Sequence, residues 1–99
     1  MEYNFEWDRK KAKKNLSKHK ISFEHAATAF KDPNAISIFD EDHSEDDEER
    51  WLTLGTSSNG SILVICHTYH QIASKAVTIR IISGRKATKK EETQYWRGL

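Results

Sequence analysis

Three apolar runs follow one another between residues 50 and 83, and they constrain the fold more than any other feature of the chain. "RWLTLGTS", "SILVICHTY" and "KAVTIRIIS" each place apolar residues as a β-strand does. The first link contains Asn59-Gly60, a pair that favours the positive φ of a tight hairpin turn. Short links join antiparallel strands, so we expect an antiparallel meander with residues 61–69 at its centre. Residues 70–75 are expected to form a looser connection.

The segments on either side of this meander add helices and two more strands. "EYNFEW" alternates like a short strand, Asp8 is placed as a helix N-cap, and residues 21–33 carry a complete apolar helical stripe. A strand over residues 34–40 follows, and "TKKE" at residues 88–91 fits a capping box opening a nearly all-polar helix, which is weakly anchored or completed by a partner. The predicted order is β-α-α-β-β-β-β-α. We expect one α+β domain over residues 1–99, an antiparallel sheet with two N-terminal helices packed on one face and a C-terminal helix.

The net charge of +1 conceals a segregation of charge along the chain. Residues 1–31 carry eight Lys or Arg and four Asp or Glu, whereas residues 32–49 carry nine acidic residues and no Lys or Arg. Residues 50–99 again carry eight Lys or Arg, against two acidic residues. If the two basic ends meet in the fold, they form a cationic surface suited to phosphate groups.

Composition argues against a membrane-spanning protein and against a protein stabilised by disulfide bonds. No apolar run approaches the roughly 20 residues that a membrane helix needs, and "MEYNFEWDRKK" lacks the apolar region of a signal peptide. Cys66 is the single cysteine and lies in an apolar run, which favours a small buried side chain over a nucleophile. We therefore expect a cytoplasmic protein without a membrane partner.

Arg80 interrupts the alternation of Val77, Ile79 and Ile81 in the last apolar run. A buried guanidinium is costly to desolvate unless it is paired, so we expect Arg80 to project from the face opposite to the core. His67 can lie beside it there if the strand register permits. The two groups suit cleavage of RNA, because RNA supplies its own 2′-hydroxyl nucleophile and needs no metal. An ordinary surface arginine beside a strand-terminal histidine is the alternative that these residues leave open.

More cations follow Arg80, at Arg85, Lys86, Lys89 and Lys90. The last two fall in the first turn of the predicted C-terminal helix, where cations oppose the helix dipole by about 0.3–1 kcal/mol each. That placement favours a use in binding RNA phosphates over a merely solvated face.

Other candidate sites carry weaker signals. The acidic segment 40–49 lacks the glycine and the spacing of a calcium loop, so a solvated loop is favoured over a metal site. His67 and His70 are three residues apart, which on a strand places the two rings on opposite faces. Trp51 is predicted to lie in the core or at its edge, with a base-stacking platform as the alternative. We expect no metal and no cofactor.

Four blocks of the chain resemble the BrnT family of bacterial toxins: "FEWDRKKAKKNLSKHKISFEHAATAF", "EERWLTLG", "LVICHT" and "RIISGRKATKKE". Their order and spacing match from Phe5 to about Tyr95. The resemblance implies a fold related to RelE-type ribonuclease toxins and an endoribonuclease that halts translation by cutting RNA. It also implies a partner, an antitoxin of the BrnA kind with a ribbon-helix-helix domain, through which alone the complex binds operator DNA.

The polar signature of that family falls on a defined set of positions in this chain. The catalytic groups implied are Arg80, His67, Arg85 and Glu49, with His67 favoured over Glu49 as the general base. The implied RNA-binding residues are Lys18, His19, Arg50, Trp51 and Ser83, and the run of cations after Arg80 adds Lys86 and Lys89 as RNA-binding candidates. The chain departs from the pattern in having Lys20 for a glycine, Ser61 for a basic residue and Lys86 for an arginine. The residues that can replace the cation missing at position 61 are His70 and Lys75.

Two other functions stay open on the same residues. One is a module that has lost catalysis, binds the antitoxin and acts with it as an operon co-repressor. The polar C-terminal helix and the missing cation at Ser61 favour it. The other is a metal-binding domain built on residues 40–49 and the histidines, which the ligand spacing disfavours.

Overall fold

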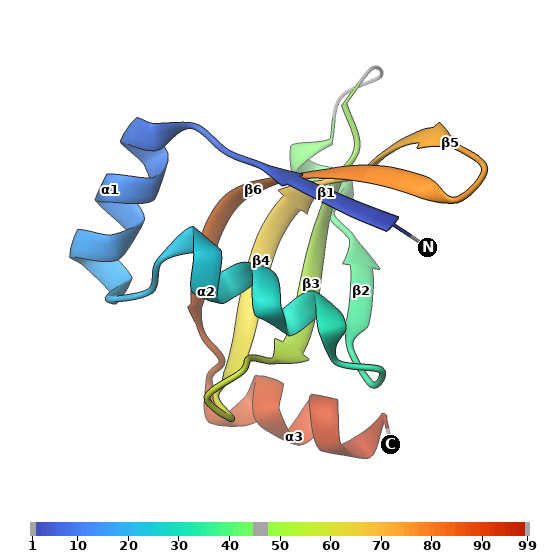
Figure 1. The fold of residues 1–99 in the computed structure, drawn as a ribbon. Helices are drawn as coiled ribbons and strands as arrows, with labels where there is room; N and C mark the ends of the chain where they lie inside the picture. The colour runs from blue at the N-terminus through green and yellow to red at the C-terminus, as the bar shows by residue number, and fades with distance from the viewer. Residues whose placement is uncertain (1, 45–47, 99) are drawn as a thin grey trace.

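The computed structural model of the chain describes residues 2–44 and 48–98. Figure 1 shows its strands, α-helices and short 3-10 helices (η). In chain order they are β1 Glu2–Glu6, α1 Arg9–His19, α2 Phe23–Ala27, η1 Thr28–Lys31, β2 Ile36–Phe39, η2 Glu41–His43, β3 Arg50–Thr56, β4 Ile62–Thr68, β5 His70–Ala73, β6 Ala76–Lys86 and α3 Lys89–Arg97. None of the described helices is long and apolar enough to cross a membrane.

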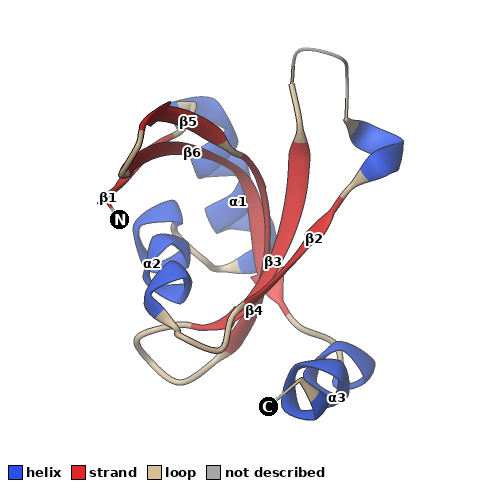
Figure 2. Ribbon diagram, turned by 90° about the vertical axis from the view of Figure 1, so that its right-hand side faces the viewer, coloured by secondary structure: helices blue, strands red, loops and turns tan. Residues whose placement is uncertain are grey.

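The long strand β6 organises the sheet. Its first half pairs in parallel with β1 and antiparallel with β5, and its second half pairs antiparallel with β4. The main order across the sheet is β1-β6-β4-β3-β2. Figure 2 shows the sheet curling around α2, with β1, β5 and the start of β6 at the curled end. The predicted α+β fold and element order are confirmed, and the predicted antiparallel sheet contains one parallel pair, β1 with β6.

Strand β5 lies where the sequence predicted a loose connection. Only Tyr69 separates it from β4, and it continues β4 alongside β6. His70 pairs with Thr78 and Gln71 with Val77, so the two segments form one long, bent hairpin with β6. The alternating pattern over residues 70–73 is too short and too polar to predict a strand. Pairing with β6 stabilises this segment as a strand in the folded protein.

One face of the sheet is covered by the N-terminal helices and holds the larger core. Phe23 and Ala26 of the predicted helical stripe are fully buried in one core cluster with Val77 and Ile79 of β6. The chain changes to a 3-10 helix at Thr28, so Ala29 is buried and the predicted stripe residues Ala27 and Phe30 are only partly buried. Burying a side chain the size of Phe23 contributes about 1.5–3 kcal/mol.

Helix α3 covers the lower part of the opposite face. Thr88 and Glu91 form the predicted capping box, and Tyr95 is buried with Leu54, Ile62 and Val64. The Tyr95 hydroxyl donates a short hydrogen bond to Asp32. Side chains of its own domain thus hold the helix through one buried tyrosine and a capping box, although its composition is nearly all polar.

Helix α1 is fastened beside β6 by one buried side chain. The amide of Asn15 donates hydrogen bonds of 3.0 and 2.9 Å to the carbonyl oxygens of Ile21 and Gly84, and accepts one of 3.0 Å from Gly84 N. Buried polar groups must be hydrogen-bonded, and Asn15 meets this need through backbone groups of β6 and of the α1–α2 link. The bonds set which face of α1 lies over the second half of β6.

Candidate functional site

The sheet face opposite α2 carries a cleft where β6, β5 and β1 meet the start of β3. Val77, Ile79 and Ile81 are buried against the helices, so alternation turns Arg80 outward as predicted and leaves its side chain 44% exposed. The cleft has a volume of about 460 Å³. We call it the Arg80 cleft, and it is lined by Glu6, Glu48, Glu49, Thr68, Tyr69, His70, Thr78 and Arg80.

Arg80 lies among carboxylates. Its Nη2 is 2.8 Å from Glu48 Oε1, and the same oxygen is 3.7 Å from Arg50 Nε, so Glu48 lies between two guanidinium groups. Glu6 is the partner of Arg80 in the parallel β1–β6 register. The side chains of Arg80 and Glu48 are 44% and 36% exposed, and exposed ion pairs contribute only about 0–1 kcal/mol. An incoming phosphate can therefore replace the carboxylate on Arg80.

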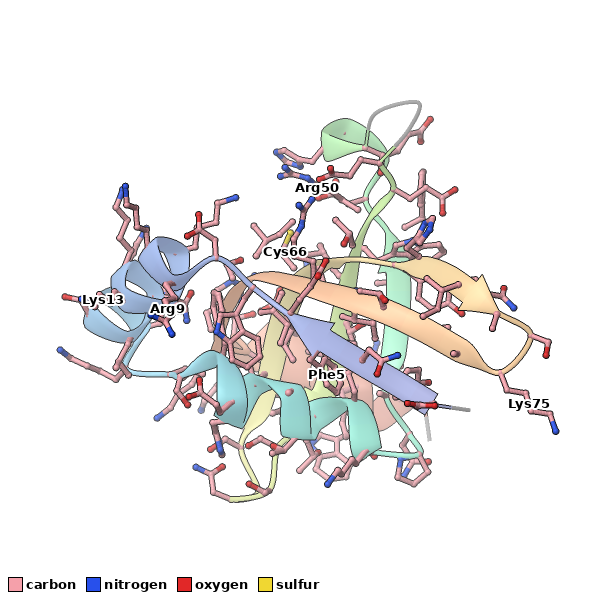
Figure 3. The ribbon with its side chains drawn as sticks, turned by 45° about the horizontal axis from the view of Figure 1, so that its top comes forward. Phe5, Arg9, Lys13, Arg50, Cys66 and Lys75 are labelled. Carbon is pink, nitrogen blue, oxygen red and sulfur yellow. The ribbon has the colours of Figure 1, made fainter. Side chains whose placement is uncertain are left out.

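His70 is the imidazole of the cleft. It pairs with Thr78 across the β5–β6 hairpin, and Thr78 lies on the same face of β6 as Arg80. A guanidinium, carboxylates and an imidazole in one open cleft can bind a phosphate and move protons beside it. Figure 3 shows Lys75 at the tip of the hairpin, pointing away from the body of the protein, so of the two expected replacement cations only His70 lies in the cleft.

His67 lies on the other side of the sheet, in the core. It is 2% exposed, its Nε2 is 2.6 Å from Thr53 Oγ1, and its Nδ1 is 3.0 Å from Thr68 O. Its ring packs edge-on against Phe30, with centroids 4.9 Å apart. Burial lowers the pKa of His67, which favours the neutral ring.

The expected placement of His67 beside Arg80 is therefore wrong. The register pairs His67 with Ile81, and cross-strand partners project from the same face. Since Ile81 faces the core, so does His67. His67 lies in the core and His70 lines the Arg80 cleft, so the two rings lie on opposite faces, as their spacing predicted.

Arg85 and the cations after it lie apart from the Arg80 cleft. Arg85 is five residues further along β6, roughly 17 Å at the rise of a strand. It makes a bidentate pair with Glu91, with Nη1–Oε1 and Nη2–Oε2 distances of 2.7 and 3.0 Å. Hydrogen bonds from Arg85 lower the pKa of Glu91 to about 2. Arg85 thus fastens α3, while Lys86 and Lys89 are exposed.

A family model described as "Ribonuclease toxin, BrnT, of type II toxin-antitoxin system" matches residues 7–91. The chain belongs to the BrnT family. The crystal structure of the ribonuclease toxin BrnT of Brucella abortus has a similar fold, with a TM-score of 0.56 and 21% identity over 90% of this chain and 100% of that chain. No curated protein sequence matches the chain. The resemblance found in the sequence is confirmed, and membership in this family supports ribonuclease activity, an RNA target and an antitoxin partner.

Most of the remaining residues implied by the BrnT resemblance fall into two groups. Glu49 lines the Arg80 cleft, and Arg50 is connected to it through Glu48, whose Oε1 is 3.7 Å from Arg50 Nε. Figure 3 shows Arg50 close to Cys66. A second hollow of about 340 Å³, which we call the α1 groove, separates α1 from β6. It contains three of the implied RNA-binding residues and is lined by Lys11, Lys14, Asn15, Lys18, His19, Ile82 and Ser83.

Trp51 and Cys66 are half-buried, in agreement with structural roles. Trp51 packs edge-on against Phe39 with centroids 5.2 Å apart, and its register partner His67 places it on the core face. Trp51 therefore lies at the edge of the core, which is one of the two positions expected for it. Burial raises the pKa of the Cys66 thiol, which disfavours the reactive thiolate.

The three departures from the BrnT pattern lie together. Lys20, Ser61 and Lys86 all line a hollow of about 320 Å³ at the end of β6, which we call the end pocket. Its other lining residues are His19, Ile21, His25, Asn59 and Leu63. The cation missing at Ser61 is thus offset by the additional cation at Lys20, and the pocket keeps a cationic character.

Sequence reasoning missed Glu48 and undervalued His70. Glu48 belongs to an acidic segment without periodicity, where no pattern distinguishes one carboxylate from the next. The spacing of His67 and His70 showed that only one ring can share a face with Arg80, but choosing between them required the register. In residues 2–44 and 48–98, no three His, Cys, Asp or Glu side chains are grouped as metal ligands would be.

Proposed function

We propose that the Arg80 cleft is the catalytic site of an endoribonuclease that cleaves RNA by attack of its own 2′-hydroxyl, without a metal. Arg80 holds the scissile phosphate and neutralises the charge that develops on it. Glu48 is the general base and His70 the general acid. Arg50, which shares Glu48 with Arg80, orients the base and the phosphate.

The reaction balances with these groups alone. Glu48 accepts the proton of the 2′-hydroxyl while the 2′-oxygen forms a bond to phosphorus. The bond from phosphorus to the 5′-oxygen breaks, and His70 donates a proton to that oxygen. The products are a 2′,3′-cyclic phosphate on one fragment and a 5′-hydroxyl on the other.

The pairing of Arg80 with Glu48 is the observation that carries this proposal. The carboxylate oxygen 2.8 Å from the guanidinium occupies a position that a phosphate oxygen can take in an arginine–phosphate contact. When phosphate takes that position, the carboxylate is displaced by a short distance and lies beside the sugar. Glu49 lines the same cleft, but no ion pair with Arg80 or Arg50 positions it. Glu48 is for this reason favoured over Glu49.

The test is cleavage of RNA by the purified protein in the presence of EDTA. We expect fragments ending in 2′,3′-cyclic phosphate, and a loss of about 10²–10³-fold in kcat for Arg80→Ala. Arg97→Ala, which removes an exposed arginine of α3, is the matched control and retains activity. Cleavage that EDTA abolishes, or an Arg80→Ala protein that cuts as fast as wild type, contradicts the proposal.

We further propose that the partner is a BrnA-like ribbon-helix-helix antitoxin, that operator DNA is bound only through it, and that the toxin acts on translation in the cytoplasm. The alternative is a decayed module that acts only as a co-repressor with that antitoxin. One observation favours it, because Glu48 already neutralises Arg80 in the free chain. Growth arrest on induction that Arg80→Ala abolishes supports the toxin and excludes the decayed module.

A further inference from the structure

Helix α1 presents its cations on two separate faces. Lys11, Lys14 and Lys18 follow the i, i+3, i+7 spacing of one face and line the α1 groove beside β6. Arg9 and Lys13 line a different hollow, between α1 and α2. Figure 3 shows Arg9 and Lys13 on α1, well apart from Arg50. One helix therefore carries lysines that face β6 and matched cations that do not.

Along β6, the Arg80 cleft lies on the sheet face opposite α2 and the end pocket on the α2 face, with the α1 groove beside the strand between them. Arg80 lines the first, Ile82 and Ser83 the second, and Lys86 the third. His19 lines both the α1 groove and the end pocket, so these two hollows adjoin each other. At the rise of a strand, Arg80 and Lys86 are roughly 20 Å apart.

The end pocket is built for an anion. Lys20, Lys86 and two histidines line it together with the polar side chains of Asn59 and Ser61. Among the described residues, no acidic side chain lines it, and neither lysine takes part in an ion pair. Nε2 of His25 is buried and has no hydrogen-bond partner within the described part of the chain. An anion seated here would meet cations that no carboxylate of these residues neutralises.

We propose that an RNA strand with its scissile phosphate on Arg80 continues along the α1 groove, where Lys14 and Lys18 bind successive phosphates, and ends with a phosphate in the end pocket. This proposal rests on the proposed function, because it takes the Arg80 cleft as the place of cleavage. The substrate class is single-stranded RNA long enough to reach from Arg80 to Lys86. The lysines bind the backbone as point charges and read no sequence.

RNA fits this track better than an acidic protein segment does. The track begins at the cleft where the scissile phosphate binds. Its cations come from β6 at Arg80 and Lys86 and from successive turns of α1 between them, so they recur along the track as phosphates recur along a backbone. Single-stranded nucleic acids are bound in such grooves through backbone charge, with a strong dependence on salt.

The experiment compares two RNAs and two double variants. A trinucleotide reaches the Arg80 cleft alone, and an RNA of about 16 nucleotides also reaches the track. Lys14→Gln with Lys18→Gln removes two cations from the α1 groove. Arg9→Gln with Lys13→Gln removes two cations from the same helix and leaves the groove intact. For each protein, KM and kcat are measured on both RNAs, and binding of the long RNA is measured as a function of salt.

For the groove variant we expect KM on the long RNA to rise several-fold, with a smaller change on the trinucleotide and no comparable change in kcat. Each lysine–phosphate contact contributes about 0.7 to the slope of log K against log salt, so the slope falls by about 1.4. The Arg9/Lys13 variant keeps the wild-type slope. Equal slopes and equal KM values for the two variants would overturn the proposal.

The outcomes also separate this proposal from the function on which it rests. If the wild type cuts neither RNA, the proposed function fails, and the salt slopes still decide whether RNA binds along the track. If all variants bind RNA equally and only the groove variant escapes neutralisation by a coexpressed antitoxin, the track binds an acidic protein segment, and the RNA proposal is wrong.

Discussion

The Arg80 cleft lies along the first half of β6 and the end pocket at its last residue, and both contain a cation and at least one imidazole. They differ in their carboxylates: Glu6, Glu48 and Glu49 line the cleft, and in the described part of the chain no acidic side chain lines the end pocket. A cation with a neighbouring carboxylate can hold a phosphate and accept a proton, whereas cations alone can only hold. Carboxylates therefore decide which of the two cationic hollows can do acid–base chemistry.

The difference follows from where the acidic segment returns to the sheet. Glu48 and Glu49 immediately precede β3, whose first residue Arg50 pairs with Thr68 beside the cleft. At the other end of β6, the last turn of α1 brings Lys18 and His19, where the helix dipole favours cations. The fold therefore places acidic side chains at the Arg80 cleft and basic side chains at the end pocket.

The largest effect is expected from the carboxylates of the cleft. Glu48→Gln removes the base and is expected to lower kcat by about 10²–10⁴-fold, with KM little changed. Glu49→Gln, the neighbouring isosteric change, is expected to lower kcat much less, because Glu49 is not paired with Arg80 or Arg50. Single-turnover cleavage measures both. If Glu49→Gln lowered kcat more than Glu48→Gln does, Glu49 and not Glu48 would be the general base.

The two histidines give the next test, and they sharpen which groups belong to the cleft. His67→Ala leaves a cavity beside Phe30 and removes the hydrogen-bond partner of Thr53, so it is expected to lower the free energy of unfolding by about 2–4 kcal/mol. His70→Ala is expected to lower kcat and to leave stability almost unchanged, since His70 is exposed. Urea unfolding and cleavage rates distinguish the two. A stable His67→Ala protein with no activity would contradict this assignment.

His67 also predicts a dependence of stability on pH. Because burial lowers the pKa of His67 below its ordinary value of 6.5, the unfolded chain binds a proton more readily than the folded one. Stability is therefore complete above pH 6.5 and falls as the pH drops from there toward the folded pKa. Urea midpoints measured between neutral and mildly acidic pH test this, and His67→Phe is expected to flatten the profile.

Arg85 lies near the end of β6, next to Lys86, and lines neither the Arg80 cleft nor the end pocket. Its hydrogen bonds lower the pKa of Glu91 from 4.5 to about 2, so the pair stabilises the fold above pH 4.5 and is lost as the pH falls toward 2. Arg85 is 41% exposed, and solvent screening limits the contribution to about 1 kcal/mol. Arg85→Ala is expected to lower thermal stability by that amount. A fall in kcat as large as that of Arg80→Ala would return Arg85 to the catalytic site.

The smallest effect is expected in the end pocket. Lys86→Gln removes one phosphate contact and is expected to raise KM for long RNA about 2- to 3-fold and to leave kcat as in wild type. Lys75→Gln, which lies at the tip of the β5–β6 hairpin, is the matched control. A lower kcat for Lys86→Gln would contradict the assignment of catalysis to the Arg80 cleft and of RNA binding alone to the end pocket.

Family membership and much of the fold could be predicted from local patterns. The alternation of Val77, Ile79 and Ile81 turned Arg80 outward, and the "TKKE" box placed the start of α3 correctly. Both depend on residues within four positions of each other, where backbone geometry alone decides the outcome. The BrnT resemblance rests on the order and spacing of blocks, which are also properties of the sequence.

The neighbours of Arg80 were decided only by the tertiary structure. Alternation assigns relative faces within one strand but does not say which face of the next strand is shared, so His67 was placed wrongly until its register with Ile81 was known. Glu48 reaches Arg80 because the acidic segment returns to β3 there, which no local pattern encodes. The sequence by itself therefore determined the family, the element order and the outward turn of Arg80. Strand pairing decided which carboxylate and which histidine lie beside it, because these contacts join residues far apart in the chain.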